Sequence, residues 1–203
     1  MNYLYRMTHI ENISHILKHG ITHRSSANAN PSYVPIGDSS IIQKRLACTV
    51  ETMAGEKFSP GDFIPFYFYA RMPMLYNIQH GFHVNKVDAT NIVYIVIPLQ
   101  PIIDNPAYRF YFSDGHAISK MTRFYGKESI GNIDNILDKN AIRNNDWGED
   151  YVVRERKQAE FLVKGDIPPI HIFMLICHDE EAKIRLMASG AQCPIKIIKE
   201  AYY

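Results

Sequence analysis

With 203 residues, 46% of them apolar, the chain is long enough for one domain with a sizeable core. Its formal net charge of +1 does not show the basic excess common in tight nucleic-acid binders. Three widely spaced cysteines argue against a disulfide framework, and no apolar run reaches the roughly 18 residues of a membrane span, so we expect a cytoplasmic protein.

The first part of the chain predicts a strand followed by a helix. Residues 3–8 have the short apolar and aromatic composition of a strand. In the next segment Ile10, Ile13 and Ile16 fall on one face at helical spacing, and Gly20 stands where a glycine commonly ends a helix.

Residues 22–62 are polar and repeatedly interrupted by proline and glycine, which indicates a long loop region with one short helix near 39–46. A loop of this length inside a compact domain is usually functional or disordered. Tyr33, Val34 and Ile36 favour the ordered alternative, because they can anchor the loop to the rest of the domain.

The remaining elements mix short strands with helices. We expect one helix that begins near Pro73 and two that cover residues 132–141 and 179–189. The expected strands are residues 63–70, 91–97, 108–113, 158–164, 170–177 and 196–199. This order argues for an α+β fold in a single domain of residues 1–203 rather than a doubly wound parallel sheet. No GxGxxG segment follows a strand and no P-loop motif is present, so both nucleotide sites are disfavoured.

The sequence contains no specific motif for a zinc site or for a serine hydrolase. His15 and His19 have the spacing of a zinc-binding pair, but no glutamate follows His15 and no third ligand is evident. A solvated helix face is the favoured interpretation, and no metal is predicted. No serine lies in a GxSxG motif, and His178 beside Asp179 is not a catalytic triad by itself.

Glu160 is the carboxylate of most interest and lies in the sequence RKQAEFLV. On a strand, Ala159, Phe161 and Val163 face the core, while Glu160 projects with Gln158 to the opposite face. Residue types alone favour a structural ion pair with the neighbouring cations over a catalytic role.

Two further residues have a functional and a structural interpretation. Arg45 can clamp a phosphate through its planar guanidinium, but an isolated arginine is more often a surface residue. His116 follows a strand in the sequence FSDGHA, where a functional histidine and a turn with a capping aspartate are equally compatible with the residue types.

Taken together, the segments resemble the DarT family of DNA ADP-ribosyltransferase toxins. The similarity runs in order along nearly the whole chain and is strongest at PFYF and RMPMLY. The matching segments are residues 5–13 (YRMTHIENI), 16–20 (ILKHG), 33–37 (YVPIG), 44–45 (KR), 65–68 (PFYF), 71–76 (RMPMLY), 112–117 (FSDGHA), 156–163 (RKQAEFLV) and 202–203 (YY).

The resemblance implies an ADP-ribosyltransferase fold, in which a split, mostly antiparallel mixed sheet surrounds an NAD cleft and helices pack outside. It implies transfer of ADP-ribose from the co-substrate NAD to a base in single-stranded DNA, thymine or guanine in different branches. We favour thymine, because residues 33–45 and 112–117 resemble that branch. It further implies a DarG-type antitoxin partner that removes the modification, and we expect a monomer.

The resemblance also implies roles for single residues. Glu160 matches the catalytic glutamate and Arg45 the arginine of the catalytic site; because Lys44-Arg45 replaces a double arginine, the alignment at Arg45 could shift by one position. The expected NAD contacts are Arg6, Thr8, His9, Asn12, Gly20, Arg45, Phe66, Tyr67, Met74 and Leu75. Arg6 departs from the family pattern, where this position is often histidine.

His116 matches a histidine on the DNA side of the site, and we assign phosphate contacts to four cations: Arg24, Lys44, Arg154 and Lys157. A purely solubilising role is the alternative for these four. The alternatives for the whole protein are transfer to RNA or protein, plain NAD hydrolysis, and a nucleic-acid-binding module without catalysis.

Overall fold

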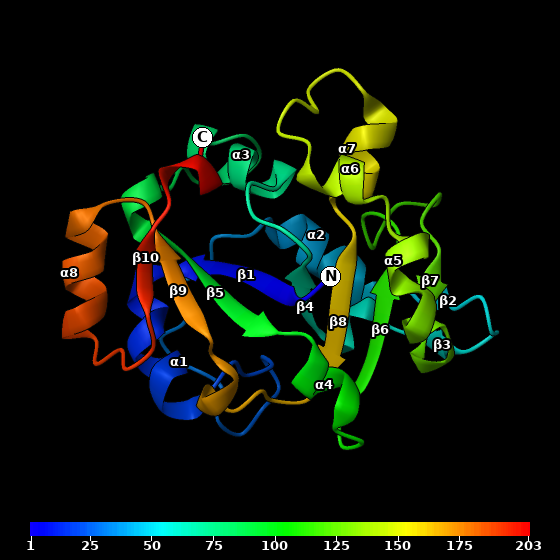
Figure 1. Ribbon diagram of the computed structural model, residues 1–203, viewed down its shortest axis with the longest axis horizontal. Coiled ribbons are helices and arrows are strands. Elements are labelled where there is room, and N and C mark those ends of the chain that lie inside the picture. The colour runs from blue at the N-terminus through cyan, green and yellow to red at the C-terminus, as the bar shows by residue number, and fades with distance from the viewer.

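In the computed structural model, which describes residues 1–203, a mixed sheet of eight strands forms the centre of the molecule (Figure 1). The strand order is β10-β9-β5-β1-β4-β8-β6-β7, and every neighbouring pair is antiparallel except β10–β9. The strands are β1 Tyr3–His9, β4 Ile64–Tyr67, β5 Ile92–Pro98, β6 Arg109–Ser113, β7 Phe124–Tyr125, β8 Glu160–Lys164, β9 Met174–Cys177 and β10 Ile195–Ile197. A separate two-stranded sheet joins β2 Val50–Glu51 to β3 Lys57–Phe58.

The sheet is split between β1 and β4. Seven Cα pairs connect β1 with β5, whereas a single pair, Tyr5 with Tyr67, connects β1 with β4. Antiparallel pairing resumes from β4 to β8, where Tyr67 lies opposite Glu160. The split, mostly antiparallel mixed sheet and the α+β class predicted for this chain are therefore confirmed.

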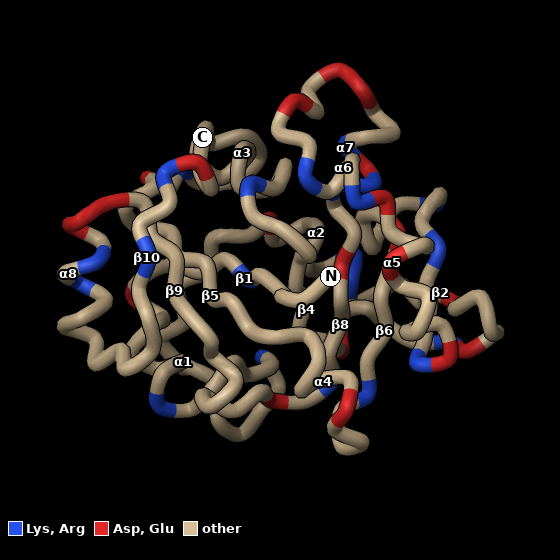
Figure 2. The backbone as a smooth tube through the Cα atoms, viewed as in Figure 1, with Lys and Arg blue, Asp and Glu red and all other residues tan.

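Eight α-helices surround the sheet: α1 Ile13–His19, α2 Ser39–Ala47, α3 Pro73–His80, α4 Gln100–Asp104, α5 Ile133–Ile136, α6 Lys139–Arg143, α7 Tyr151–Lys157 and α8 Glu180–Ala188. In Figure 1, α8 lies outside the edge strand β10, while α5 and the β2–β3 hairpin lie at the other end of the sheet. The buried strands β5 and β9 contain no charged residue, and the charges gather on the outer elements (Figure 2). None of the helices combines the length and apolar composition required to cross a membrane.

The two faces of the sheet are packed differently. Because strand residues alternate between faces, Val93, Ile95 and Ile97 join a large core of 27 buried residues on one side. Their neighbours Tyr94 and Val96 join a smaller cluster on the other face, covered by α3. A third cluster packs β6 and β8 against the β2–β3 hairpin. The second face therefore has two separate cores rather than one, and the catalytic candidates lie on this face.

Most predicted elements are present, but the strand expected over residues 170–177 is confined to Met174–Cys177, because Pro169–His171 form a 3-10 helix. The helix expected over residues 132–141 is two short helices, because Leu137 is extended and the Asp138 side chain accepts a hydrogen bond from the Ala141 amide, which starts α6. Helix α7 was not predicted; Asp150 caps it through the Val152 and Val153 amides. Gln158 ends α7 and does not belong to β8, so the prediction that it shares a strand face with Glu160 is wrong.

Candidate functional site

Glu160 begins β8 and is completely buried, with both carboxylate oxygens engaged. Oε2 accepts a hydrogen bond from Arg45 Nη1 at 2.7 Å, and Oε1 accepts one from the Ala117 amide at 3.1 Å. The Glu160 amide donates to Ser113 Oγ at 3.1 Å. The carboxylate is therefore held in one orientation by Arg45 of α2 and by the turn after β6, while Ser113 of β6 fixes the backbone of Glu160.

Arg45 reaches Glu160 from the last turn of α2, which begins where the Asp38 side chain accepts hydrogen bonds from the Ser40 and Ile41 amides. The guanidinium is 11% exposed, and its Nη2 is buried without a partner. Burial alone would lower the pKa of Arg45, but the charge and hydrogen bond of Glu160 outweigh burial and raise it above the ordinary value. One donor of a permanently charged group therefore remains available to a ligand.

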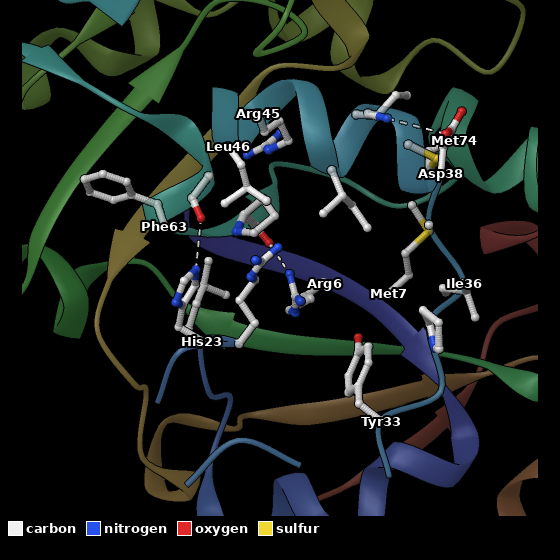
Figure 3. A pocket seen from close by; sticks show the side chains of 18 of the residues that line it. Arg6, Met7, His23, Tyr33, Ile36, Asp38, Arg45, Leu46, Phe63 and Met74 are labelled. Carbon is white, nitrogen blue, oxygen red and sulfur yellow. Dashed lines mark hydrogen bonds between the residues drawn. The ribbon is translucent and has the colours of Figure 1, made fainter. Parts of the chain in front are cut away.

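A cavity of about 550 Å³ adjoins this ion pair (Figure 3). Its lining is Arg6, Met7, Thr22, His23, Arg24, Ala29, Asn30, Tyr33, Pro35, Ile36, Gly37, Asp38, Ile41, Ile42, Arg45, Leu46, Gly61, Phe63, Ile64, Pro65, Tyr67, Met74, Ile78 and His116. The volume lies within the range typical of small-molecule sites. Glu160 does not line the cavity, because Arg45 covers it.

The cavity combines an apolar surface with cations. Arg6 crosses the split of the sheet and donates from Nη1 to the Pro65 carbonyl at 2.9 Å, and Figure 3 shows it between Arg45 and Tyr33. Arg24 adds an exposed cation. Burial, followed by the nearby charge of Glu160, raises the pKa of Tyr67, so this phenol stays protonated. Such a lining suits a flat, apolar group linked to phosphates.

The loop that forms much of the cavity wall is ordered by buried hydrogen bonds. Asn12 Nδ2 donates to the Val34 carbonyl and Asn12 Oδ1 accepts from the Val34 amide, both at 2.8 Å. At the other end Asp166 accepts from the His23 amide at 3.0 Å and from the Ser26 hydroxyl. The ordered alternative for residues 22–62 is therefore confirmed.

Six of the residues predicted to bind substrates meet at this cavity: Arg6, Arg24, Arg45, Tyr67, Met74 and His116. Phe66 and Leu75 do not line it; both are buried in the hydrophobic clusters. The reason is periodicity, because adjacent residues of a strand face opposite sides and neighbours on a helix point about 100° apart. Tyr67 therefore faces the cavity and Phe66 does not, and Met74 faces it and Leu75 does not.

The other residues of the first predicted NAD-contacting segment serve the local structure. Thr8 is completely buried, where its hydroxyl accepts a hydrogen bond from Asn12 at 3.0 Å. His9 accepts from the Glu11 amide, and burial lowers its pKa. Gly20 ends α1 at φ 86°, and an added Cβ would lie 2.2 Å from the Ile167 carbonyl oxygen. None of these residues, nor Asn12, lines the cavity.

The predicted DNA contacts separate into exposed and buried residues. Lys44 is exposed, and the Arg154 guanidinium lies 5.5 Å from the centre of the Tyr151 ring. Lys157 is 1% exposed, and its Nζ donates to the Ile142 carbonyl at 3.0 Å. The prediction that Lys157 binds a DNA phosphate is wrong, because its side chain is buried against α6 and Tyr69 and does not reach a DNA strand at the protein surface.

Two groups that orient Glu160 escaped the sequence analysis. Ala117 acts through its backbone amide and Ser113 through a buried hydroxyl that also donates to the Gly115 carbonyl. A backbone donor leaves no residue-type signal. The segment FSDGHA predicts a turn, but its histidine is the only residue in it whose type indicates a site.

Comparisons with known proteins converge on one family. The family model described as "DarT: ssDNA thymidine ADP-ribosyltransferase, DarT" matches residues 5–203. The chain is 29% identical over 208 residues to a DNA ADP-ribosyl transferase of Thermus sp. (strain 2.9), with 98% of this chain and 95% of the relative covered. It is 28% identical over 189 residues to a DNA ADP-ribosyl transferase-DNA ADP-ribosyl glycohydrolase fusion protein of Thermosipho africanus, covering 90% of this chain and 44% of the fusion.

Solved structures agree with the sequence comparison. Thermus sp. 2.9 DarT in complex with ADP-ribosylated ssDNA matches with a TM-score of 0.85 at 26% identity, covering 99% of this chain and 96% of that one. The same protein in complex with NAD+ matches with a TM-score of 0.79, also at 26% identity, covering 99% and 97%.

Proposed function

Because the chain belongs to the DarT family of single-stranded DNA thymidine ADP-ribosyltransferases, it is an NAD-dependent DNA ADP-ribosyltransferase, and we propose that Glu160 and Arg45 form its catalytic centre. The observation that carries this proposal is the buried Arg45–Glu160 ion pair beside a cavity lined with apolar groups and cations. A glutamate used only for stability would not require an adjoining cavity of this size.

The reaction demands a preplaced anion. When the bond between nicotinamide and ribose breaks, its electron pair leaves with nicotinamide and the sugar becomes an oxocarbenium-like cation. A carboxylate fixed before the reaction stabilises that cation without reorganisation. Glu160 meets this requirement through its complete burial and through the Ala117 amide, which holds Oε1 independently of Arg45.

Arg45 has to change partners for Glu160 to act. In the structure it covers the carboxylate, and its free Nη2 is a donor for the pyrophosphate of NAD. As Arg45 turns towards phosphate, Glu160 becomes accessible to the ribose hydroxyl. The same carboxylate can then accept the proton that the attacking base nitrogen loses as the new bond to the sugar forms.

We call the cavity the donor side of Glu160, because its lining suits NAD. Arg6 and Arg24 are the remaining cations for the phosphates. Tyr67 and Met74 supply a flat apolar wall for nicotinamide, and this wall excludes the water that would otherwise compete as acceptor. Thr8, His9, Asn12 and Gly20 support this side through the loop and α1 rather than through a surface in the cavity.

We call α7, with residues 144–150 before it, the acceptor side. These residues contribute nothing to the cavity wall, yet α7 leads directly into Glu160. Our proposed contact set for single-stranded DNA is Arg154 on α7, with two residues outside the acceptor side: Lys44 on α2 and His116, which also lines the cavity. Single strands are required because a paired base hides its reactive edge.

The family supports proposals on the modified base and on the partner. We propose that thymine is the modified base. The Thermosipho relative carries a DNA ADP-ribosyl glycohydrolase in the same chain, which supports a separate DarG-type antitoxin partner here. We also propose that the enzyme acts as a monomer in the cytoplasm.

Incubation with labelled NAD, followed by separation of single-stranded DNA, RNA and protein, tests the acceptor. We expect label in the DNA fraction alone. Label in RNA or protein would replace the proposed acceptor, and NAD consumption without any label would identify a plain NAD hydrolase.

A further inference from the structure

The acceptor-side loop, residues 144–150, is fixed at both ends. The buried Lys157 at the end of α7 donates from Nζ to the Ile142 carbonyl in α6, 3.0 Å away, so the two helices that flank the loop are tied together. Asp150 caps α7 at the loop's other boundary. Figure 1 shows this loop extending above α6 and α7, away from the sheet. The hydrogen bond and the aromatic contacts that attach its middle to the rest of the fold come from one side chain.

That side chain is Trp147, the single tryptophan of the chain. Its indole Nε1 donates to the Tyr203 hydroxyl at 2.7 Å. Its ring meets Tyr76 edge-on at 5.7 Å and Tyr203 edge-on at 6.2 Å between ring centroids. The other loop residues, apart from the half-buried Asn144, are exposed. Trp147 therefore attaches an otherwise exposed loop to α3 and to the last residues of the chain.

Tyr203 carries the attachment further. Its hydroxyl donates to the Arg71 carbonyl at 2.8 Å, and the Arg71 guanidinium lies 4.7 Å from the ring centre. Gln79 of α3 exchanges two hydrogen bonds with the Tyr203 backbone. Burial raises the pKa of Tyr203 to about 12, so its hydroxyl remains a donor at neutral pH. Arg71 has φ 57°, a conformation that costs energy for a non-glycine residue, and this contact helps to hold it.

This chain of contacts joins the two sides of Glu160. Helix α3 lines the donor cavity through Met74 and Ile78, and it carries Tyr76 on another face towards Trp147. The loop leads into α7, which carries Arg154 and precedes Glu160. Tyr203, together with the direct contact between Trp147 and Tyr76, thus links the wall of the donor cavity to the segment proposed to meet DNA.

We propose that Trp147 and Tyr203 form a latch that keeps residues 144–150 ordered for the acceptor strand. Both are positioning residues, because neither touches the cavity or Glu160. This inference rests on the proposed function for its substrate. Without the latch, DNA binding has to order the loop, and that entropic cost weakens binding of DNA but not of NAD.

Tyr203→Phe tests the latch, because it removes the hydroxyl and keeps the ring. We expect the KM for a single-stranded thymidine-containing oligonucleotide to rise roughly three- to tenfold, the effect of losing one or two hydrogen bonds. The KM for NAD stays unchanged. Tyr202→Phe is the matched control: it removes the hydroxyl of the adjacent buried tyrosine, which contacts the Ile92 and Ile176 carbonyls. It leaves the KM for the oligonucleotide unchanged.

Tryptophan fluorescence gives a readout that needs no substrate. We expect the emission of Trp147 to shift to longer wavelength in Tyr203→Phe and to remain as in the wild type in Tyr202→Phe. Equal emission in both variants, or an equal rise of both KM values in Tyr203→Phe, would overturn the latch. If the wild type labels no DNA, the proposed function fails, while the fluorescence comparison still decides whether the latch exists.

Discussion

The donor and acceptor sides of Glu160 are built in different ways. The donor side is a cavity lined by cations, and hydrogen bonds such as those between Asn12 and Val34 hold its wall. The acceptor side is α7 with the exposed loop before it, and this loop carries Asp146, Glu149 and Asp150. Figure 2 shows acidic residues along the loop above α7, and Trp147 attaches its middle to the rest of the fold. In the proposed mechanism two substrates meet at one carboxylate while separate segments receive them, so substitutions on the two sides should affect different substrates.

Glu160→Gln has the largest expected effect, since it removes the one group that both sides share. The amide is nearly the same size but carries no charge, so we expect DNA labelling to fall by about 10³-fold or more, as for loss of a preorganised charge-stabilising group. NAD hydrolysis should fall with it. Initial rates with labelled NAD measure the loss. Glu56→Gln, which changes an exposed carboxylate paired with Arg109, is the control and should retain the wild-type rate. Unimpaired labelling by Glu160→Gln would exclude the catalytic assignment.

Arg6→Gln and Arg154→Gln together test whether the sides are separable. Arg6 lines the cavity, so its loss should raise the KM for NAD about tenfold and leave the KM for the oligonucleotide unchanged, whereas Arg154→Gln should do the reverse. Loss of a DNA phosphate contact should also reduce the salt dependence of DNA binding by about one unit of slope. If either variant changes both KM values equally, the two sides do not bind separate substrates.

Lys157→Met has a smaller effect, which appears in stability and depends on pH. Burial, with a contribution from Arg71, lowers the pKa of Lys157 from 10.5 to about 8. Between these values the unfolded chain binds more protons than the folded one, so the wild type gains stability as the pH rises. The variant lacks this gain. Below about pH 8 it should be at least as stable as the wild type, because it no longer buries a charge.

Urea unfolding at about pH 7 and about pH 9.5 measures this difference. We expect the free energy of unfolding of the wild type to improve relative to Lys157→Met by up to roughly 1.4 kcal/mol per pH unit in this interval. Lys164→Met, which replaces an exposed lysine at the end of β8, is the control and should keep the wild-type pH profile. Parallel pH profiles for wild type and Lys157→Met would show that Lys157 is not titrating.

The sequence predicted the elements whose pattern is local and repeated. The strand over residues 92–98 is apolar at almost every position, and α1 has Ile13 and Ile16 at helical spacing with Gly20 directly after it. The break at Asp138 and helix α7 were missed because they depend on single capping aspartates in polar, weakly periodic segments. Short helices of this kind gain their stability from tertiary packing.

For the site, the sequence alone identified Glu160 as a strand carboxylate but favoured a structural ion pair. The structure contains that ion pair, with Arg45, and places it beside a cavity. Residue types could not separate the two roles, because the partner lies 115 residues away along the chain. The burial of Lys157 was unpredictable for a similar reason, since it depends on how α6 packs against α7.

Mass spectrometry of nucleosides from a single-stranded oligonucleotide treated with protein and NAD tests the central claim most directly. The account predicts a thymidine that carries one ADP-ribose, no adduct when the same strand is annealed into a duplex, and none with Glu160→Gln. An adduct that persists with Glu160→Gln would contradict the catalytic role of Glu160, and equal modification of duplex and single strand would contradict the requirement for an exposed base.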